Sequence, residues 1–387
     1  MHILVVGAGL MARGLLYDLC RNEAVTRIVV TDRSKAALDA LRKHHADDHI
    51  EWVECDATDD AAMRPLLAEV DGIISAAHYG LNLRLTELAI EAGCNMVDLG
   101  GNNTVVASQL ALDERARAAG VSIVPDCGLA PGLASLLVAW GARHLPWATG
   151  AHVRVGGLPQ DPTEPLRYER LFNVQGLINE YVEVPVALRN GVITELEPLG
   201  DLEHIDLPQP IGKLEAFNTS GGVSTLPQTF AHRFTDIDYK TFRYPGHAHA
   251  MRWLLELGMF NWETVNLDGT MVSPRALLSR QLEAHVPMCE RDTTVVVVRF
   301  TGSDDRTHEL RIIDHFDETS QLTAMMRTTA FPAAIVAQLQ SSGRVPDAGV
   351  IPQELAVDCD LFLDELEARG IIIHGRIGGT VAAPVGH

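Results

Sequence analysis

The sequence has few cysteines, and none of them are paired in a short motif. The six are Cys20, Cys55, Cys94, Cys127, Cys289 and Cys359, and no two form a C-x-x-C pair. Common zinc sites and dense disulfide frameworks both require closely spaced cysteines. The spacing therefore excludes both, predicts no metal site, and favours reduced thiols in a cytoplasmic protein.

Long apolar runs and positive charge are also scarce. No apolar stretch approaches the roughly 18 residues of a membrane span, and residues 1–6 enter a strand pattern without the basic segment that opens a signal peptide. Lys and Arg number 31 against 51 Asp and Glu, which gives a formal net charge of -20. Phosphate backbones and anionic lipid repel such a surface, so we expect neither nucleic acid nor a membrane as a partner.

The chain alternates strand and helix patterns over its first 145 residues. Its 387 residues are too many for one ordinary core and predict at least two domains. Short apolar runs separated by helical stretches occur at residues 3–6, 27–31, 51–55, 72–76, 96–99 and 121–124, and the helical stretch before the last of these runs is expected over residues 108–119. Each connection is long enough for a crossover, so residues 1–145 predict an α/β domain with a Rossmann-type, doubly wound parallel sheet.

The pattern changes from residue 146 onward. Residues 184–188 and 192–196 flank Asn190-Gly191, a strong hairpin signal. Further strand patterns occur at 293–300 and 309–316, and helices are expected near 249–257 and 274–285. Adjacent strands joined by short turns predict an α+β domain with a mixed or antiparallel sheet over residues 146–320.

The last segment, residues 321–387, turns helical again. Helical patterns cover residues 322–340 and 359–369, and Pro332 inside the first predicts a kink or a break. We expect these helices to pack back against the first domain. Residues 378–387 are rich in small side chains and are expected to be a loose tail.

A glycine-rich turn follows the first strand. The residues Gly7-Ala8-Gly9-Leu10-Met11-Ala12 have the form G-x-G-x-x-G/A. Gly7 permits a tight turn, Gly9 lets the backbone approach a pyrophosphate, and Ala12 allows a helix to pack closely on the sheet. Phosphates would then meet the backbone N–H groups at the start of the helix, near Leu10 and Met11.

The second strand ends in Asp32, 20 positions after Ala12. A carboxylate there accepts hydrogen bonds from the adenosine ribose and repels a 2′-phosphate. Asp32 therefore favours NAD as the cofactor, whereas Arg33, directly after it, leaves some room for NADP.

The ends of the third and fourth strands supply further cofactor candidates. Asp56 and Ala57 either reach the adenine or, in the case of Asp56, cap the next helix. Ser75, Ala76 and Ala77 either let the backbone run beside the ribose and nicotinamide or simply permit tight packing. All of these residues belong to the carboxyl edge of the predicted sheet, where ligands of such sheets bind.

Two residues after the sixth strand are candidates for the reaction site. Asp126 can hold an amine or ammonium, or it can cap the loop. Cys127 is a candidate substrate contact, although a cysteine is more often a small buried residue than a nucleophile.

The second domain contains two unusual segments. Residues 217–227 are rich in small and hydroxyl side chains around Ser220 and Gly221, which is typical of either a loop touching a ligand or a surface turn. Residues 238–247 then gather four functional side chains, namely Lys240, Arg243, Tyr244 and His247. Arg243 can clamp a carboxylate with two hydrogen bonds, with Tyr244 beside it. His247 or Lys240 can accept a proton. The alternative interpretation of each of these side chains is an ordinary exposed charge or, for His247, a histidine with structural hydrogen bonds only.

At these residues the sequence resembles the lysine 6-dehydrogenase branch of the saccharopine dehydrogenase family. The resemblance covers nearly the whole chain and rests on GAGLMARGLLYDL, VPDCGLAPGLA, EAFNTSGGVSTLP, KTFRYPGHA, AFPAAIVAQL and GVIPQEL. It implies a homo-oligomer that uses NAD to deaminate the ε-amine of L-lysine oxidatively, forming 2-aminoadipate 6-semialdehyde. The family also includes saccharopine reductases and carboxynorspermidine dehydrogenases, so an NADP-dependent reductive condensation is an alternative activity. A non-catalytic NAD-binding regulator is a third interpretation.

A lysine substrate sets a requirement for the site. Its ε-amine is mostly protonated at neutral pH, and hydride can leave the adjacent carbon only when the nitrogen lone pair is free. We therefore expect Asp126 near the amine, His247 or Lys240 as a proton relay, and Arg243 on the substrate carboxylate.

Overall fold

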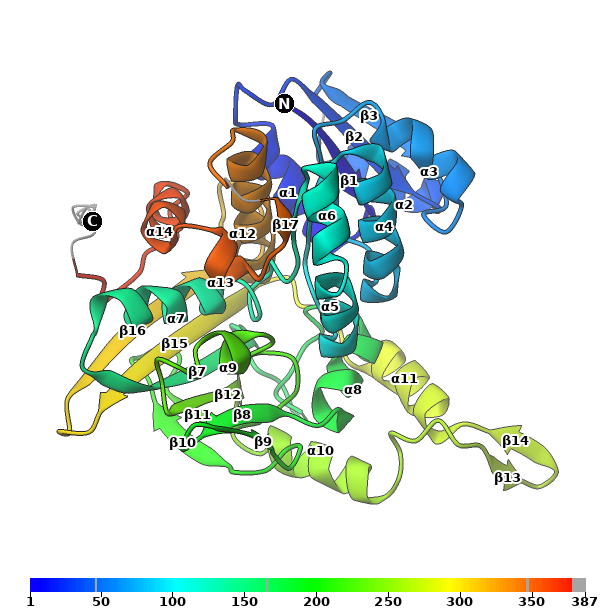
Figure 1. Ribbon diagram of the computed structural model, residues 1–387. Helices are drawn as coiled ribbons and strands as arrows, with labels where there is room; N and C mark the ends of the chain where they lie inside the picture. The colour runs from blue at the N-terminus through cyan, green and yellow to red at the C-terminus, as the bar shows by residue number, and fades with distance from the viewer. Residues whose placement is uncertain (46, 165, 346–347, 378–387) are drawn as a thin grey trace.

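The computed structural model describes residues 1–45, 47–164, 166–345 and 348–377. Figure 1 shows the N-terminal domain, blue to cyan, above a second domain that is mainly green to yellow. The C-terminal helices, orange and red, return to the side of the N-terminal domain. Within the described ranges, no helix is both long and apolar enough to cross a membrane.

The N-terminal domain is built on a seven-stranded sheet in the order β17-β6-β5-β4-β1-β2-β3. Every pairing in it is parallel. The strands are β1 (His2–Val6), β2 (Arg27–Asp32), β3 (Ile50–Glu54), β4 (Gly72–Ser75), β5 (Asn95–Asp98), β6 (Ser122–Val124) and β17 (Gly349–Val350). The doubly wound α/β fold predicted from the sequence is confirmed, and the order continues past β6 to a strand that the sequence pattern did not indicate.

Helices cover both faces of this sheet. They are α1 (Leu10–Leu19), α2 (Lys35–Arg42), α3 (Asp60–Leu67), α4 (Asn82–Ala92), α5 (Asn103–Leu110) and α6 (Asp113–Ala119), with a 3-10 turn η1 (Tyr79–Leu81) before α4. The next helix, α7 (Leu133–His144), packs instead on the sheet of the second domain. Alternate residues of β1 enter different cores, since Ile3 and Val5 belong to one cluster and Leu4 and Val6 to the other. A strand buried on both faces reads as an unbroken apolar run, as β1 does.

The second domain carries a mixed sheet in the order β10-β11-β12-β7-β15-β16, with β8 beside β12 and β9 beside β8. Strands β12 and β7 run parallel, and the other neighbours are antiparallel. The strands are β7 (Ala148–Pro159), β8 (Val186–Arg189), β9 (Val192–Glu195), β10 (Glu203–Asp206), β11 (Lys213–Asn218), β12 (Asp236–Arg243), β15 (Asp292–Gly302) and β16 (Thr307–His315). Helices α8 (Val174–Val182), α9 (Leu226–Thr229), α10 (His247–Glu256) and α11 (Pro274–His285) surround them. The predicted mixed sheet and the hairpin at Asn190-Gly191 are both confirmed.

One sequence-based helix boundary is wrong, and one of the two alternatives expected at Pro332, a kink or a break, does not apply. The helix expected over residues 108–119 is two helices, because the Asn102 side chain accepts hydrogen bonds from the first turn of α5 and starts it earlier, and Asp113 and Glu114 open α6. The break expected at Pro332 does not occur, since α12 (Ala324–Ser341) continues through it. Both neighbours of the proline, Phe331 and Ala333, are buried, so tertiary packing holds the helix across the missing hydrogen bond.

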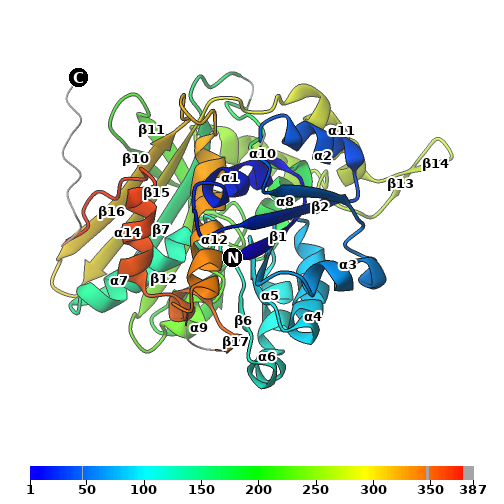
Figure 2. The same cartoon turned by 90° about the horizontal axis from the view of Figure 1, so that it is seen from above.

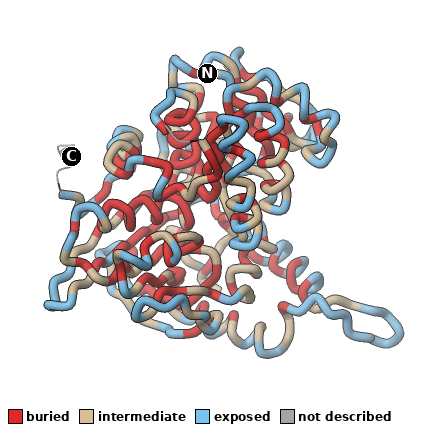
Figure 3. Tube along the Cα trace, in the orientation of Figure 1, coloured by how far each residue is buried: buried red, intermediate tan, exposed pale blue. Residues whose placement is uncertain are grey.

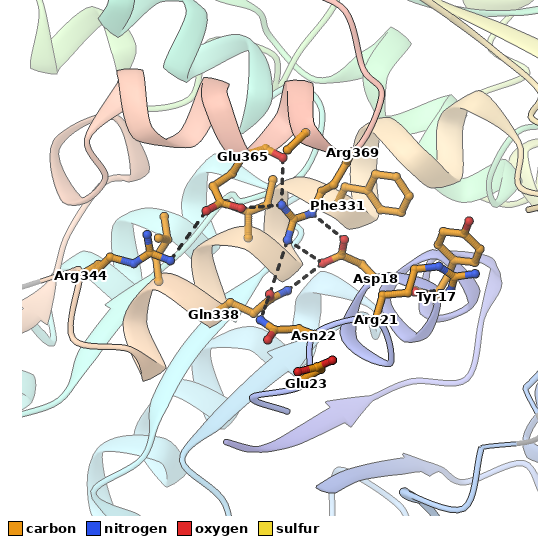
Figure 4. A pocket seen from close by; sticks show the side chains of 13 residues that line it. Tyr17, Asp18, Arg21, Asn22, Glu23, Phe331, Gln338, Arg344, Glu365 and Arg369 are labelled. Atoms are coloured by element: carbon orange, nitrogen blue, oxygen red, sulfur yellow. Dashed lines mark hydrogen bonds and ion pairs between the residues drawn. The ribbon is translucent and has the colours of Figure 1, made fainter. Parts of the chain in front are cut away.

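The C-terminal helices are fastened to α1 by buried polar contacts. Helices α13 (Gln353–Ala356) and α14 (Cys359–Ala368) follow α12. The Asp18 carboxylate accepts hydrogen bonds from Gln338 Nε2 at 2.7 Å and from Arg369, and Asn22 donates to Gln338. A cavity of about 660 Å³ lies between α1, α12 and α14. Figure 4 shows the hydrogen bonds and ion pairs between the polar side chains that line it. Residues 378–387, expected as a loose tail, lie outside the described residues.

Candidate functional site

The glycine turn after β1 has the backbone geometry that the sequence motif requires. Gly7 has φ of +101°, and a Cβ there would lie 2.9 Å from the Ala76 backbone. A Cβ at Gly9 would meet nothing within 4 Å, so the space above the start of α1 is open. No side chain caps α1, and its first N–H groups are available to an anion. The turn therefore fits a dinucleotide pyrophosphate.

A pocket of about 440 Å³ extends from this turn along the carboxyl edge of the sheet. Eight of the predicted cofactor residues line it, namely Gly7, Gly9, Asp32, Arg33, Asp56, Ala57, Ala76 and Ala77. Ser75 does not line it, because its buried hydroxyl donates to Asn82. Leu10 is exposed beside the turn, and Met11 lines a neighbouring pocket.

Asp32 holds the glycine turn in place and still has acceptor capacity. Its Oδ2 accepts from the Ala8 N–H at 2.9 Å, and its Oδ1 accepts from the Ser34 N–H at 2.8 Å. A carboxylate can accept about four hydrogen bonds, so Asp32 can also receive ribose hydroxyls. Asp56 closes its own loop through Thr58, and the helix cap that the sequence allowed for Asp56 is made by Asp59 instead.

Two smaller pockets continue the cofactor pocket into one cleft between the domains. The first, of about 220 Å³, shares Ala77 and His78 with the cofactor pocket. The second has a volume of about 260 Å³. The two smaller pockets share Ala130, Pro131, Phe172, Asn173 and Glu180. We refer to these two smaller pockets together as the inner cleft.

Strand β12 presents alternate side chains to the inner cleft. Tyr239, Thr241 and Arg243 line it, as the two-residue period of a strand requires. Lys240 lies on the opposite face, where its Nζ is 2.9 Å from Asp201 Oδ2 and 3.4 Å from Glu203 Oε2. The candidate proton acceptor Lys240 is therefore placed outside the cleft.

Arg243 is the cation of the inner cleft. Its Nε donates to the Tyr181 hydroxyl at 3.2 Å, and its Nη1 donates to the Phe242 carbonyl at 2.9 Å. The guanidinium lies over the Tyr168 ring at 5.1 Å. A guanidinium has five N–H donors, so these contacts orient it and leave donors for a substrate carboxylate.

His247 supports Arg243 from behind the cleft wall. Its Nδ1 lies 3.2 Å from the Leu166 carbonyl, which can only accept, so Nδ1 carries the proton and Nε2 accepts from Tyr181 at 2.9 Å. Burial and the nearby Arg243 lower the pKa of His247 to about 3. The imidazole is therefore neutral, and it does not line the inner cleft. It positions Tyr181 and, through Tyr181, Arg243.

Glu180 of α8 is a cleft residue that the sequence analysis did not identify. It lines both inner pockets, and its Oε2 lies 3.7 Å from Arg243 Nη2. Burial raises the pKa of Glu180 to about 7, with Arg243 opposing the rise and Glu183 adding to it. A carboxyl group with this pKa accepts and releases protons near neutral pH. The sequence feature that could have indicated Glu180 is the polar side of the amphipathic segment 173–183.

Glu183 adds a second carboxylate to the cleft. It accepts hydrogen bonds from the Ser220 hydroxyl and from Asn102 Nδ2, both at 3.3 Å. Burial raises the pKa of Glu183 as well. Ser220 and Gly221, two of the candidate substrate contacts, line the same pocket, and Gly221 has a positive φ of +88°.

Asp126 lies beneath the cleft floor. Its carboxylate accepts from the Ser224 hydroxyl of the second domain, and its other oxygen, Oδ1, is buried without a hydrogen-bond partner and close to Gly100. Burial, with further contributions from Asp98 and Glu354, raises the pKa of Asp126 to about 8. The residue ties the two domains together directly under a lining glycine.

Two other candidate contacts lie away from the cleft. Cys127 is fully buried, and burial raises the pKa of its thiol well above the ordinary value. The Tyr244 hydroxyl donates to the Pro159 carbonyl at 3.1 Å. Among the described residues, no group of three or more His, Cys, Asp or Glu is arranged to hold a metal ion.

A nucleotide-binding parallel sheet that faces a mixed-sheet domain across a polar cleft defines a two-domain dehydrogenase. The chain belongs to the saccharopine dehydrogenase family. Residues 3–124 match the saccharopine dehydrogenase NADP binding domain, and residues 128–371 match the saccharopine dehydrogenase C-terminal domain. The protein is therefore an oxidoreductase with an NAD(P)-type nucleotide domain.

Individual relatives are distant. Saccharopine dehydrogenase [NADP(+), L-glutamate-forming] of Saccharomyces cerevisiae is 21% identical over 100% of this chain and 88% of its own length. Carboxyaminopropylagmatine dehydrogenase of Synechocystis is 23% identical over 97% of this chain and 98% of its own length. At these identities the two relatives support the assignment of this chain to the family and to dehydrogenase chemistry in general.

Solved structures support the fold. Apo saccharopine dehydrogenase (L-Glu forming) from Saccharomyces cerevisiae superposes with a TM-score of 0.77 at 19% identity, covering 96% of this chain and 98% of that one. The homospermidine synthase from Legionella pneumophila, in complex with NAD, gives a TM-score of 0.71 at 12% identity, covering 97% of this chain and 91% of that one.

Proposed function

We propose that the protein catalyses the NAD-dependent oxidative deamination of the ε-amine of L-lysine. The observation that carries this proposal is the charge content of the inner cleft. Among the described residues that line it, Arg243 is the one Lys or Arg, and Glu180 and Glu183 are the two carboxylates. Lysine has one carboxylate and two ammonium groups, which complements this set.

The proposed chemistry begins with a proton transfer. Glu180, with its pKa raised to about 7, takes a proton from the ε-ammonium and frees the nitrogen lone pair. Bound NAD supplies the hydride acceptor for the adjacent carbon. Water then adds to the resulting iminium carbon and ammonia leaves, so lysine, water and NAD give 2-aminoadipate 6-semialdehyde, ammonia, NADH and a proton. Arg243 holds the α-carboxylate throughout, which fixes the distance between the carboxylate and the reacting carbon.

The preference for NAD over NADP is part of the proposal and rests on Asp32. Its carboxylate stands at the end of β2 and lines the cofactor pocket, where it would repel a 2′-phosphate. The yeast relative is named for NADP, and Arg33 lines the same pocket, so the preference requires a direct measurement.

A second candidate is a reductive condensation that uses NADPH. A saccharopine-type product carries additional carboxylates and would need a second cation, which the described lining of the inner cleft does not supply. A carboxynorspermidine-type conjugate has one carboxylate and several amines and matches the same charge set, and a relative named carboxyaminopropylagmatine dehydrogenase favours keeping this candidate. A non-catalytic NAD-binding regulator is the third candidate, and it leaves the pairing of Arg243 with Glu180 unexplained.

One assay separates these candidates. The purified protein is incubated with L-lysine, L-ornithine, saccharopine and diamines, each with NAD and with NADP, and reduced nicotinamide and ammonia are measured. The proposal requires equal amounts of NADH and ammonia from lysine. Saccharopine or a carboxylated polyamine turning over with NADP, and lysine not, would establish condensation chemistry instead. Cofactor binding without turnover of any amine would support the regulator.

A further inference from the structure

Tyr239 is a residue of the inner cleft that the proposed proton transfer does not involve. It lies on the same face of β12 as Arg243, and it lines the pocket of about 260 Å³ together with Glu180. The strands around it belong to the interior of the protein, since residues 214–220 and 240–244 are all buried. Figure 3 shows this part of the second domain largely in red, the colour of buried residues. A tyrosine hydroxyl in such surroundings needs hydrogen-bond partners, and its partners decide what it can bind.

A glycine makes room for the ring of Tyr239. A Cβ built at Gly222 would collide with the ring, so any side chain at that position would displace the tyrosine. Gly222 directly follows Ser220 and Gly221, which line the neighbouring pocket of the inner cleft. The loop that borders the cleft therefore also fixes the position of Tyr239.

Three hydroxyl groups form a chain that ends at Tyr239. The Thr241 hydroxyl donates to the Tyr239 oxygen at 3.4 Å, and the Thr219 and Thr241 oxygens lie 2.7 Å apart. A hydroxyl has a single proton to donate, so Thr241, which gives its proton to Tyr239, accepts from Thr219. The O–H of Tyr239 is then the last donor of the chain, and it has no acceptor among the described residues. The chain therefore leaves Tyr239 as a hydrogen-bond donor for a molecule in the cleft.

The Tyr239 hydroxyl stays protonated near neutral pH. Burial raises the pKa of Tyr239, and the charge of Glu180 raises it further, whereas Thr241 and Arg243 oppose the rise. Figures 1 and 2 show α8, which carries Glu180, below the nucleotide domain and at the side of the mixed sheet. A neutral donor on β12 and the proposed base on α8 thus border the same pocket.

We propose that the Tyr239 hydroxyl donates a hydrogen bond to the oxygen atom that water adds to the substrate carbon. This role rests on the proposed oxidative deamination and concerns its hydrolytic half. A dedicated donor cannot bind the ε-ammonium group, which itself has only donors, and Arg243 holds the α-carboxylate. The acceptor that gains charge during the reaction is the oxygen of the tetrahedral intermediate, and a fixed donor stabilises such an oxygen.

The oxygen from water carries negative charge in the step in which ammonia leaves. Water first forms a C–O bond with the iminium carbon and releases one proton to solvent. Its second proton passes from oxygen to nitrogen, which leaves an anionic oxygen beside an ammonium group. The C–N bond then breaks, the oxygen becomes the aldehyde carbonyl, and ammonia departs. Tyr239 keeps its own proton throughout, and one donor of this kind typically contributes about 10²- to 10³-fold to kcat.

The variant Y239F tests this role in the first turnover, followed by stopped-flow absorbance of NADH. We expect kcat for L-lysine to fall about 10²- to 10³-fold, with a burst of NADH equal to the number of active sites before the slow steady state. The deuterium isotope effect on kcat, measured with lysine deuterated at C6, should approach 1, because hydride transfer no longer limits turnover. Slower hydride transfer without a burst, or a higher KM with an unchanged kcat, would overturn the inference.

The matched control is Y244F, which removes a hydroxyl of the same kind outside the cleft. The Tyr244 hydroxyl donates to the Pro159 carbonyl at 3.1 Å. The variant Y244F should show no NADH burst and the isotope effect of the wild type. A burst in Y244F as large as that in Y239F would show that the effect does not come from a donor in the cleft, and would contradict the role of Tyr239.

A binding measurement separates failure of this role from failure of the proposed function. The probes are 6-hydroxy-L-norleucine, which has an oxygen in place of the ε-nitrogen of lysine, and L-norleucine, which lacks that oxygen. With NADH bound, calorimetry should show that the wild type binds the hydroxylated probe at least 10-fold more tightly and that Y239F loses this preference. Equal binding of both probes by a wild type that oxidises lysine would contradict the role of Tyr239 alone. Binding of neither probe, together with no NADH from lysine, would contradict the proposed function and this inference with it.

Discussion

Arg243 Nη2 and Glu180 Oε2 lie 3.7 Å apart across the inner cleft, one on β12 and the other on α8. The separation exceeds that of a charge-assisted hydrogen bond, so neither group is saturated by the other. Tyr181 and the Phe242 carbonyl hold the guanidinium in place, while Glu180 has a pKa of about 7. The pair combines a fixed cation with a titrating carboxyl group, and both can be tested separately.

Replacing Arg243 should weaken substrate binding and leave cofactor binding unchanged. Lysine keeps the charge but cannot form two parallel hydrogen bonds. For R243K we expect the KM for L-lysine to rise about 10- to 100-fold, since a charge-assisted hydrogen bond is worth about 1.5–3 kcal/mol. Steady-state kinetics give the KM, and NADH fluorescence gives the cofactor Kd. An unchanged KM would remove Arg243 from substrate recognition.

Glu180 should control the pH dependence of the reaction near neutrality. The carboxylate form is the proton acceptor, so kcat/KM should rise as the pH rises through about 7. For E180Q we expect kcat to fall by about 10²- to 10⁴-fold and the inflection near pH 7 to disappear. The activity of E180Q should still rise at alkaline pH, because there the ε-amine of the substrate loses its own proton and needs no base.

Glu183 provides the control for this assignment. Its charge raises the pKa of Glu180, so E183Q should move the inflection to lower pH without abolishing it. An inflection that survives E180Q, or one that E183Q removes, would assign the titrating base to another residue. A loss of the inflection in H247Q alone would favour the histidine that the sequence suggested.

The cofactor turn could be predicted from the sequence because its requirements are local. Gly7 needs a positive φ and has no room for a Cβ, and Asp32 follows at the end of the adjacent strand. Each of these requirements concerns a few consecutive residues of backbone. A short motif therefore carries enough information to locate the nucleotide pocket.

The substrate side could be predicted only in part, because tertiary packing decides it. Lys240 and Arg243 are close in sequence, yet the alternation of β12 places them on opposite faces. That alternation was available from the sequence and would have separated them. Glu180 is different, since a polar helix face has the same pattern whether it borders solvent or a cleft. Its role follows only from the way α8 lies against the nucleotide domain.

Asp32 should set the discrimination between the two nicotinamide cofactors. Asparagine can keep one backbone hydrogen bond in the turn and removes the charge that repels a 2′-phosphate. In D32N we expect the ratio of the Kd for NADPH to the Kd for NADH to fall about 10- to 100-fold, equivalent to about 1.4–2.7 kcal/mol. The control is D56N, a carboxylate of the same pocket, which should change the ratio far less. A wild type that binds NADPH more tightly than NADH would contradict the proposed preference.

Asp126 should make the folded protein less stable as the pH rises. Its pKa is about 8 in the folded state, because burial disfavours the charge, against an ordinary value of 3.8. Between these values the folded state holds a proton that the unfolded chain has released, so stability is highest below about pH 4 and is lost as the pH rises to about 8. Above that pH this residue adds no further slope.

The variant D126N isolates this effect from that of the other buried carboxyl groups, because asparagine stays neutral at every pH. Scanning calorimetry from pH 5 to pH 8 should show the Tm of D126N increasingly above that of the wild type. The gap should widen by about 1–2 °C per pH unit, because each unit of pKa difference is worth about 1.4 kcal/mol and a chain of 387 residues has an unfolding entropy of about 0.8 kcal/mol/K. The variant D48N changes an exposed carboxylate and should keep a constant offset. A Tm difference between D126N and wild type that does not depend on pH would show that Asp126 is already ionised in the folded protein. In that case the hydrogen bond from Ser224 would join a charged carboxylate to the second domain.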